Sequence, residues 1–183
     1  NANGYGESAK HLISDSGVYY LAFLGYDEYE TGYCQLDISV SASQTIIPIE
    51  EGFAALQETT ALPYSTTVDL GGDGAVIYRI SDEGNDIYAY AELLKVDLKQ
   101  DDLLEIGLYS ADGSYCDTYL EIYQKTDSGF ECLDYFDGTY MEGGELISYT
   151  VPADGTYYLA FEGYDISAVG LCKLITNVIP QKN

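Results

Sequence analysis

The sequence has no tryptophan, one methionine and one histidine, His11, in 183 residues. A catalytic triad needs a base beside its nucleophile, and His11 has only Ser8, Ser14 and Asp15 near it in sequence. A single histidine also argues against a structural zinc site. We expect no enzyme activity. A glycoside hydrolase ranks last among the functions, since 31 acidic residues supply many accidental carboxylate pairs.

Basic residues are scarce as well. Seven Lys and Arg face 31 Asp and Glu, which gives a net charge of −24. Such a surface repels phosphate backbones and anionic lipid heads, so we expect no nucleic-acid partner. No apolar run approaches the roughly 18 residues of a membrane span, so we expect no membrane insertion. The charge serves solubility in the simplest interpretation, and it leaves cations, basic proteins and neutral glycans as ligands.

What the sequence does contain favours strands. Apolar residues make up 46% of the chain, which also holds 20 Tyr and 19 Gly. Short Tyr-rich apolar runs alternate with Gly- and Asp-rich turns, a pattern typical of an all-β, jelly-roll-like antiparallel β-sandwich. Residues 81–86 are predicted to form an acidic loop. The expected strands are 66–70, 76–80, 91–98, 103–109, 118–123, 129–135, 146–151, 156–162 and 171–178.

One short helix is expected near residues 49–57. Pro48 precedes two acidic residues, and Ile49, Phe53 and Leu56 follow at helical spacing. In the last strand, Cys172, Leu174, Thr176 and Val178 alternate and should share one face.

An internal repeat divides the chain. The segment from Gly17 to Asp27 returns from Gly155 to Asp165, and 12 of the 21 positions from 16 to 36 are identical at this offset of 138. Residues 46–183 therefore form one complete unit. Residues 1–45 correspond to the C-terminal portion of a preceding repeat, which has one apolar face to cover. We expect this portion to dock on the complete module, with strand exchange between chains as the alternative.

Two segments resemble the bacterial pre-peptidase C-terminal domains. They are Asp117-Thr118-Tyr119-Leu120-Glu121-Ile122-Tyr123 and the run from Val151 to Leu159, Val-Pro-Ala-Asp-Gly-Thr-Tyr-Tyr-Leu. The resemblance implies a jelly-roll-like sandwich attached to secreted enzymes or surface proteins. Modules of this family are accessory, and some bind substrate polymers or calcium. The chain departs from the family pattern by carrying four cysteines.

Calcium is the candidate cofactor. Hard cations prefer several oxygen ligands, which Asp-rich loops supply. The first candidates are Asp117, Asp134 and Asp137, predicted at one end of neighbouring strands. Solvated turn acids are the alternative interpretation, because Asp is common in turns. The second-ranked acids are Asp112, Asp82, Glu83 and Asp86.

Cysteines and tyrosines give the remaining candidates. Cys116 and Cys132 flank a predicted hairpin, where they either form a disulfide or remain small buried thiols. Cys34 and Cys172 occupy equivalent positions in the two copies and are predicted to fill the core. Tyrosines near strand ends provide a possible ligand platform, namely Tyr115, Tyr135, Tyr140 and Tyr164.

These observations predict a secreted or bacterial cell-surface module that recognises an extracellular polysaccharide or protein and stands in tandem with copies of itself. The alternative is a structural spacer repeat that binds nothing.

Overall fold

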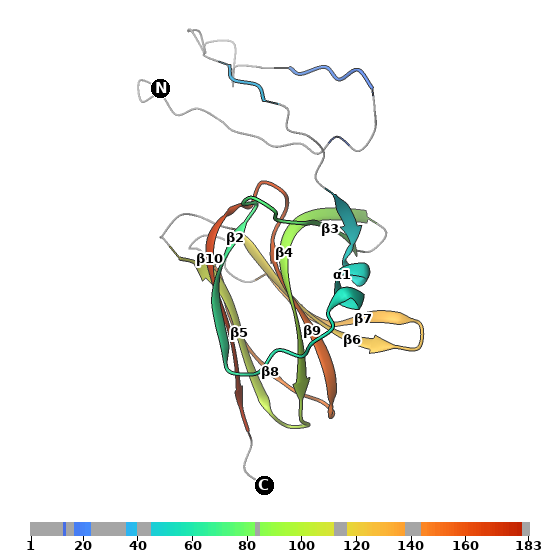
Figure 1. Cartoon of the computed structure of the whole chain (residues 1–183), viewed down its shortest axis with the longest axis vertical. Helices are drawn as coiled ribbons and strands as arrows, with labels where there is room; N and C mark the ends of the chain where they lie inside the picture. Colours follow the sequence, from blue (N-terminus) through green and yellow to red (C-terminus); the bar gives the residue numbers. More distant parts are fainter. Residues whose placement is uncertain are drawn as a thin grey trace.

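Two β-sheets pack face to face in the computed structural model of the chain (Figure 1). The structure describes residues 13, 17–22, 36–39, 45–82, 85–111, 117–137 and 144–180. One sheet has six strands in the order β1-β3-β4-β9-β6-β7, and the other has four in the order β2-β10-β5-β8. The first sheet contains β1 (Ile46–Pro48), β3 (Ile77–Asp82), β4 (Asn85–Leu98), β9 (Gly155–Gly163), β6 (Thr118–Thr126) and β7 (Gly129–Phe136). The second contains β2 (Tyr64–Leu70), β10 (Gly170–Ile179), β5 (Leu103–Ser110) and β8 (Gly144–Thr150).

The main hydrophobic core lies between the two sheets. Alternate residues of the central strands point inward, so Leu120 and Ile122 of β6 meet Leu104 and Ile106 of β5, all with no exposed surface. Burying each such side chain stabilises the fold by roughly 1.5–3 kcal/mol. Cys172, Leu174, Thr176 and Val178 of β10 also face this core, which confirms the predicted alternation.

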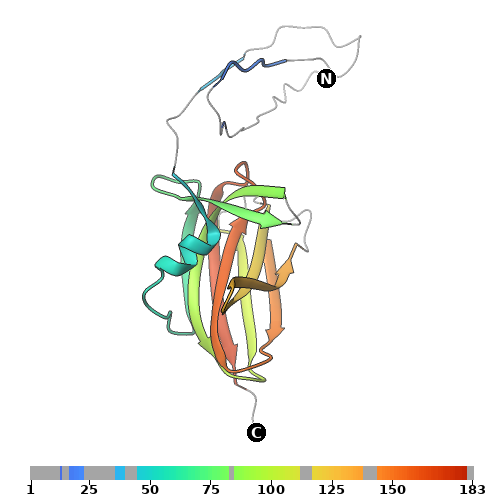
Figure 2. The ribbon, with the colours of Figure 1, turned by 90° about the vertical axis from the view of Figure 1, so that its right-hand side faces the viewer.

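A second, smaller core covers the outer face of the six-stranded sheet. The helix α1 (Ile49–Ala55) lies against this face beside the hairpin of β6 and β7 (Figure 2). Seven residues are too few for an independently stable helix, so packing must hold it. Phe53 supplies that packing, with its ring centroid 4.9 Å from Tyr123 and 5.5 Å from Tyr158. Strand β9 is therefore buried on both faces.

The antiparallel sandwich and the short helix are confirmed, with the helix ending at Ala55. At the start of the module one expectation was wrong and one element was not predicted. The loop predicted over residues 81–86 is wrong for its described residues, because β3 continues to Asp82 and β4 already begins at Asn85. A short strand, β1, was missed, and it pairs with β3 in parallel rather than antiparallel. Three residues carry too little periodicity to reveal such a strand.

The N-terminal segment is described only in part. Residues 17–22 and 36–39 form no helix or strand, and Tyr20 and Val18 are 93% and 81% exposed. Their repeat partners, Tyr158 and Thr156, lie in β9 of the complete module. Most of residues 1–45 lies outside the described residues, so docking and strand exchange stay predictions. No helix in the described part of the chain has the length and apolar character of a membrane span.

Candidate functional site

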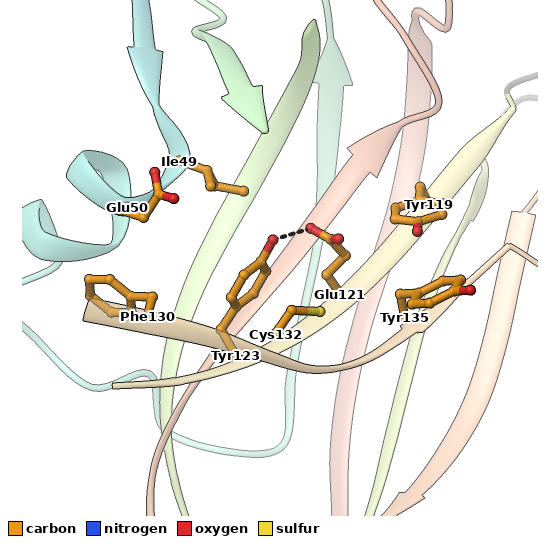
Figure 3. A pocket seen from close by; sticks show the side chains of 8 residues that line it. All are labelled: Ile49, Glu50, Tyr119, Glu121, Tyr123, Phe130, Cys132 and Tyr135. Atoms are coloured by element: carbon orange, nitrogen blue, oxygen red, sulfur yellow. Dashed lines mark hydrogen bonds between the residues drawn. The ribbon is translucent and has the colours of Figure 1, made fainter. Parts of the chain in front are cut away.

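A pocket of about 290 Å³ opens on the outer face of the six-stranded sheet, between α1 and the β6–β7 hairpin (Figure 3). Aromatic rings and carboxylates line it together. Its walls are formed by Ile49, Glu50, Tyr119, Glu121, Tyr123, Phe130, Cys132 and Tyr135.

The strand register explains why these side chains meet. Tyr119, Glu121 and Tyr123 alternate along β6 and so share the outer face. Cys132 and Tyr135 are three residues apart on β7, a spacing that would place them on opposite faces of a regular strand. The register shifts opposite Ile122 and Tyr123, and this bulge turns both side chains toward the pocket.

Two buried carboxyl groups lie at the centre of this face. Glu121 on β6 is 7% exposed, and Glu162 on the neighbouring strand β9 is 1% exposed. Glu162 pairs in register with Tyr119 and so lies on the same face as Glu121. The two carboxyl groups are hydrogen-bonded to each other. Such a bond requires a proton on one of them, because two carboxylates are both acceptors.

The surroundings assign that proton to Glu162. Complete burial raises the pKa of Glu162 well above its usual value, and the neighbouring charge of Glu121 raises it further. Glu121 has a second donor, since the Tyr123 hydroxyl donates a hydrogen bond to its Oε2 at 2.5 Å. Burial and the charge of Glu121 also raise the pKa of Tyr123, which keeps that hydroxyl protonated. Oε1 of Glu162 has no hydrogen-bond partner.

Two tyrosines form the outer rim of the pocket. The rings of Tyr119 and Tyr135 stack with centroids 5.9 Å apart and an interplanar angle of 18°. Tyr135 is 63% exposed, so one face of this pair is open to solvent. On the opposite side, Figure 3 places Phe130 below Glu50.

Cys132 points into the pocket as a free thiol. Its Sγ donates to the backbone oxygen of Asp134 at 3.4 Å. Partial removal of water and the charge of Glu121 raise the pKa of this thiol to about 12. A thiol that stays protonated at neutral pH is a poor nucleophile. The arrangement therefore does not activate Cys132 for catalysis.

The predicted calcium ligands do not come together as a set of three. Asp117 lies near Asp137, and its pKa is raised by burial first and then by the charges of Asp137, Asp165 and Glu145. Asp134 lies further along β7, opposite Ile122, and its Oδ1 accepts a hydrogen bond from the Tyr135 amide at 3.0 Å.

No three His, Cys, Asp or Glu within the described ranges are arranged to hold a metal ion. Calcium binding by Asp117, Asp134 and Asp137 thus stays a prediction without a preformed site. Of the second-ranked acids, Asp82 ends β3 and Asp86 forms an ion pair with Arg79 at 3.9 Å. Glu83 and Asp112 lie outside the described residues.

Of the two predicted platform tyrosines within the described residues, Tyr135 lines the pocket and Tyr164 does not. Tyr164 is 51% exposed beyond the end of β9, while Tyr115 and Tyr140 lie outside the described residues.

Cys132 is a free thiol, so it takes no part in the predicted disulfide. The alternative of a small buried thiol is wrong for Cys132, whose residue is exposed, and Cys116 itself lies outside the described residues.

Sequence reasoning missed Glu121 and Glu162, the two groups at the centre of the site. A signal was present: each is the one charged residue in an apolar stretch of a predicted central strand. In the first copy of the repeat, the position of Glu162 holds Leu24.

Comparison with known proteins gives distant structural likenesses alone. No known family profile and no curated protein sequence matches the chain. The chain is similar to the pre-peptidase C-terminal domain of a collagenase from Bacillus anthracis, with 10% identity and a TM-score of 0.41 over 76% of this chain and 100% of that one.

Two further solved structures are similar at a TM-score of 0.35. The K3 cleaved adhesin domain of Lys-gingipain from Porphyromonas gingivalis is 16% identical, over 64% of this chain and 91% of that one. The enzymatically active domain of tailspike protein 4 from bacteriophage CBA120 is 14% identical, over 67% of this chain and only 18% of that one. Because these TM-scores are low, the assignment of a β-sandwich rests on the two sheets of this structure and not on the likenesses.

Proposed function

We propose that this chain is an extracellular, non-catalytic accessory module that binds a polysaccharide or a protein at the outer face of its six-stranded sheet. The observation that carries the proposal is the stacked pair of Tyr119 and Tyr135 at the rim of a pocket. Rigid aromatic side chains give a large contact area at little cost in conformational entropy. The repeat in the sequence further supports a module that stands beside copies of itself.

The geometry of the carboxyl pair speaks against a glycoside hydrolase. The two catalytic carboxyl groups of such enzymes stand at least about 5 Å apart, on either side of the scissile bond. Glu121 and Glu162 instead share a hydrogen bond beneath the surface, with 7% and 1% of each residue exposed. A sugar ring has no room between them.

Arrays of bacterial, plant and animal polysaccharides and of extracellular matrix proteins test the proposal with the intact chain as the probe. A binding module is expected to give a saturable signal with one class of partner. Saturable binding that survives 0.5 M salt excludes diffuse charge attraction. A spacer repeat, the alternative function, would bind nothing on either array, and that result would overturn the proposal.

A further inference from the structure

Glu162 is an unusual residue for its position. It lies on a central strand with both faces of that strand buried, and its Oε1 has no hydrogen-bond partner. Leaving a buried polar atom unpaired costs about 1–3 kcal/mol. A buried carboxyl group in this position needs an explanation from function, since an apolar residue would pack there at no such cost.

The groups around Glu162 are suited to a positive charge. Glu121 accepts hydrogen bonds beside it, and Glu50 lies across the pocket on the first turn of α1. Tyr119 and Tyr135 present aromatic faces at the rim, and such faces attract cations within about 6 Å. Lys125 already shows this preference nearby, with its Nζ 5.9 Å from the Phe130 ring centroid.

We propose that this pocket receives the cationic side chain of a lysine or arginine from a basic protein partner, with Glu121 as the anionic floor, Tyr119 and Tyr135 as the aromatic wall, and Glu162 buried beside Glu121. This inference rests on the proposed binding function and names the kind of group that the site recognises.

The depth of the pocket floor favours a lysine or arginine side chain over an amino sugar as the ligand. Glu121 is only 7% exposed at the floor of the pocket, so only a slim group on a flexible stem reaches it. Lysine and arginine carry their charge on such an apolar stem, which can pack against Ile49 and Phe130. The amine of an amino sugar is attached directly to a bulky ring. The tyrosines at the rim of the pocket would keep that ring, and with it the amine, away from the floor. The net charge of −24 also steers basic proteins toward this chain.

The carboxyl pair gives the site a distinctive signature. A cation placed beside the pair favours the charged form of both groups. The proton that Glu162 holds in the free protein is then released to the solvent as the ligand binds. Binding of a side chain at any other acidic patch of ordinary carboxylates, already charged at pH 7, releases no proton.

The test uses the full chain and three peptides with blocked ends, Gly-Gly-Lys-Gly-Gly, Gly-Gly-Arg-Gly-Gly and the same peptide with norleucine in place of the cation. Amide chemical shifts locate binding, and titration calorimetry in phosphate and in Tris buffer counts the protons released. We expect the two cationic peptides to bind with proton release and to shift the amides of residues 119–123 and 160–163. The norleucine peptide should bind at least about tenfold more weakly.

Three variants complete the test. Glu121→Gln should weaken binding of the lysine peptide by at least about tenfold. Glu162→Gln keeps the shape of the side chain and should abolish proton release. This variant keeps the proposal testable if Glu121→Gln does not fold. Asp73→Asn removes one charge from an exposed turn and should bind like the original chain.

The inference is overturned if both Gln variants bind the cationic peptides as tightly as the original chain, if Asp73→Asn weakens binding equally, or if the shifts map elsewhere. Binding of a glucosamine oligosaccharide at this pocket without binding of the peptides would also overturn it. Binding of the oligosaccharide alone would still agree with the proposed binding function. The absence of binding on both arrays would instead contradict the proposed function itself.

Discussion

Glu121 and Glu162 lie on adjacent strands of the six-stranded sheet and hydrogen-bond to each other through their carboxyl groups. The pair therefore holds one proton at a pH where two free glutamates would hold none. This places an ionisable group where the rest of the outer-face core is apolar or aromatic, and it ties the stability of the module to pH.

Glu162→Gln should make the module more stable at pH 7.5 and flatten its pH dependence. Because the folded pKa of Glu162 lies above that of the unfolded chain, the folded state binds more protons in the interval between the two values. The stability that Glu162 contributes is thus complete below the unfolded pKa, about 4.3 for Glu. It is lost as the pH rises through the folded value. Glutamine keeps the hydrogen bond to Glu121 without this loss.

Urea unfolding of Glu162→Gln and of the original chain from pH 4 to pH 8 measures this difference. Asp73→Asn is the matched control, since it removes one exposed charge from the same acidic background. Equal pH slopes for Glu162→Gln and Asp73→Asn would mean that general repulsion, and not the buried pair, sets the dependence.

Gly144→Ala should destabilise the module by about 2–4 kcal/mol. A Cβ at this residue would come within 2.2 Å of the backbone oxygen of Leu108 on the paired strand β5, at a φ of 137° that favours glycine. Gly129→Ala is a matched control, with a φ of 139° and nothing within 4 Å of the added Cβ. It should cost only the backbone strain, about 1 kcal/mol. Thermal unfolding of both variants checks the ranking, and equal losses would contradict the close approach of β5 and β8.

Cys132 should react slowly with iodoacetamide at pH 8, despite its exposure. With a pKa of about 12 it forms far less thiolate than an ordinary cysteine, so its alkylation rate should be more than about tenfold lower than that of a cysteine in an unstructured peptide. Mass spectrometry of peptides from the alkylated chain isolates this residue from the other three cysteines. Glu121→Gln should speed the reaction, because it removes a charge that raises the pKa. A rate equal to that of the free peptide would contradict this description of the pocket.

A chain that begins at Thr45 should fold on its own, since none of the described residues before Thr45 (13, 17–22 and 36–39) belongs to either hydrophobic core. The predicted docking of residues 1–45 should then appear as a lower unfolding midpoint of the truncated chain. Scanning calorimetry of the two chains tests this. A loss of several degrees on truncation would indicate that residues 1–44 dock on the module. A full chain that is dimeric beside a monomeric truncated chain would indicate strand exchange.

Much of the sandwich followed from the sequence because period-2 alternation and glycine-rich turns are local signals. The inward row of Cys172, Leu174, Thr176 and Val178 was predicted on this basis and was found in the core. The strand β1 and its parallel partner were not predictable, since three residues and a non-local pairing leave no such pattern. The pocket was missed for a related reason. It depends on which strands are neighbours, and Glu121 and Glu162 are 41 positions apart in the sequence.

The platform prediction shows the same limit. Tyr135 was among the four predicted tyrosines, but its stacking partner Tyr119 was assigned no role. Only the pairing of β6 with β7 brings the two rings together.

The most direct test of the binding module is a comparison of two tyrosine variants against whichever array partner the intact chain binds. Tyr135→Ala removes the open ring of the stacked pair, and Tyr109→Ala removes a 39% exposed ring from the other sheet. Surface plasmon resonance should give a dissociation constant at least about tenfold higher for Tyr135→Ala and an unchanged value for Tyr109→Ala. Equal affinities for the two variants and the original chain would show that the partner binds elsewhere and would contradict the account.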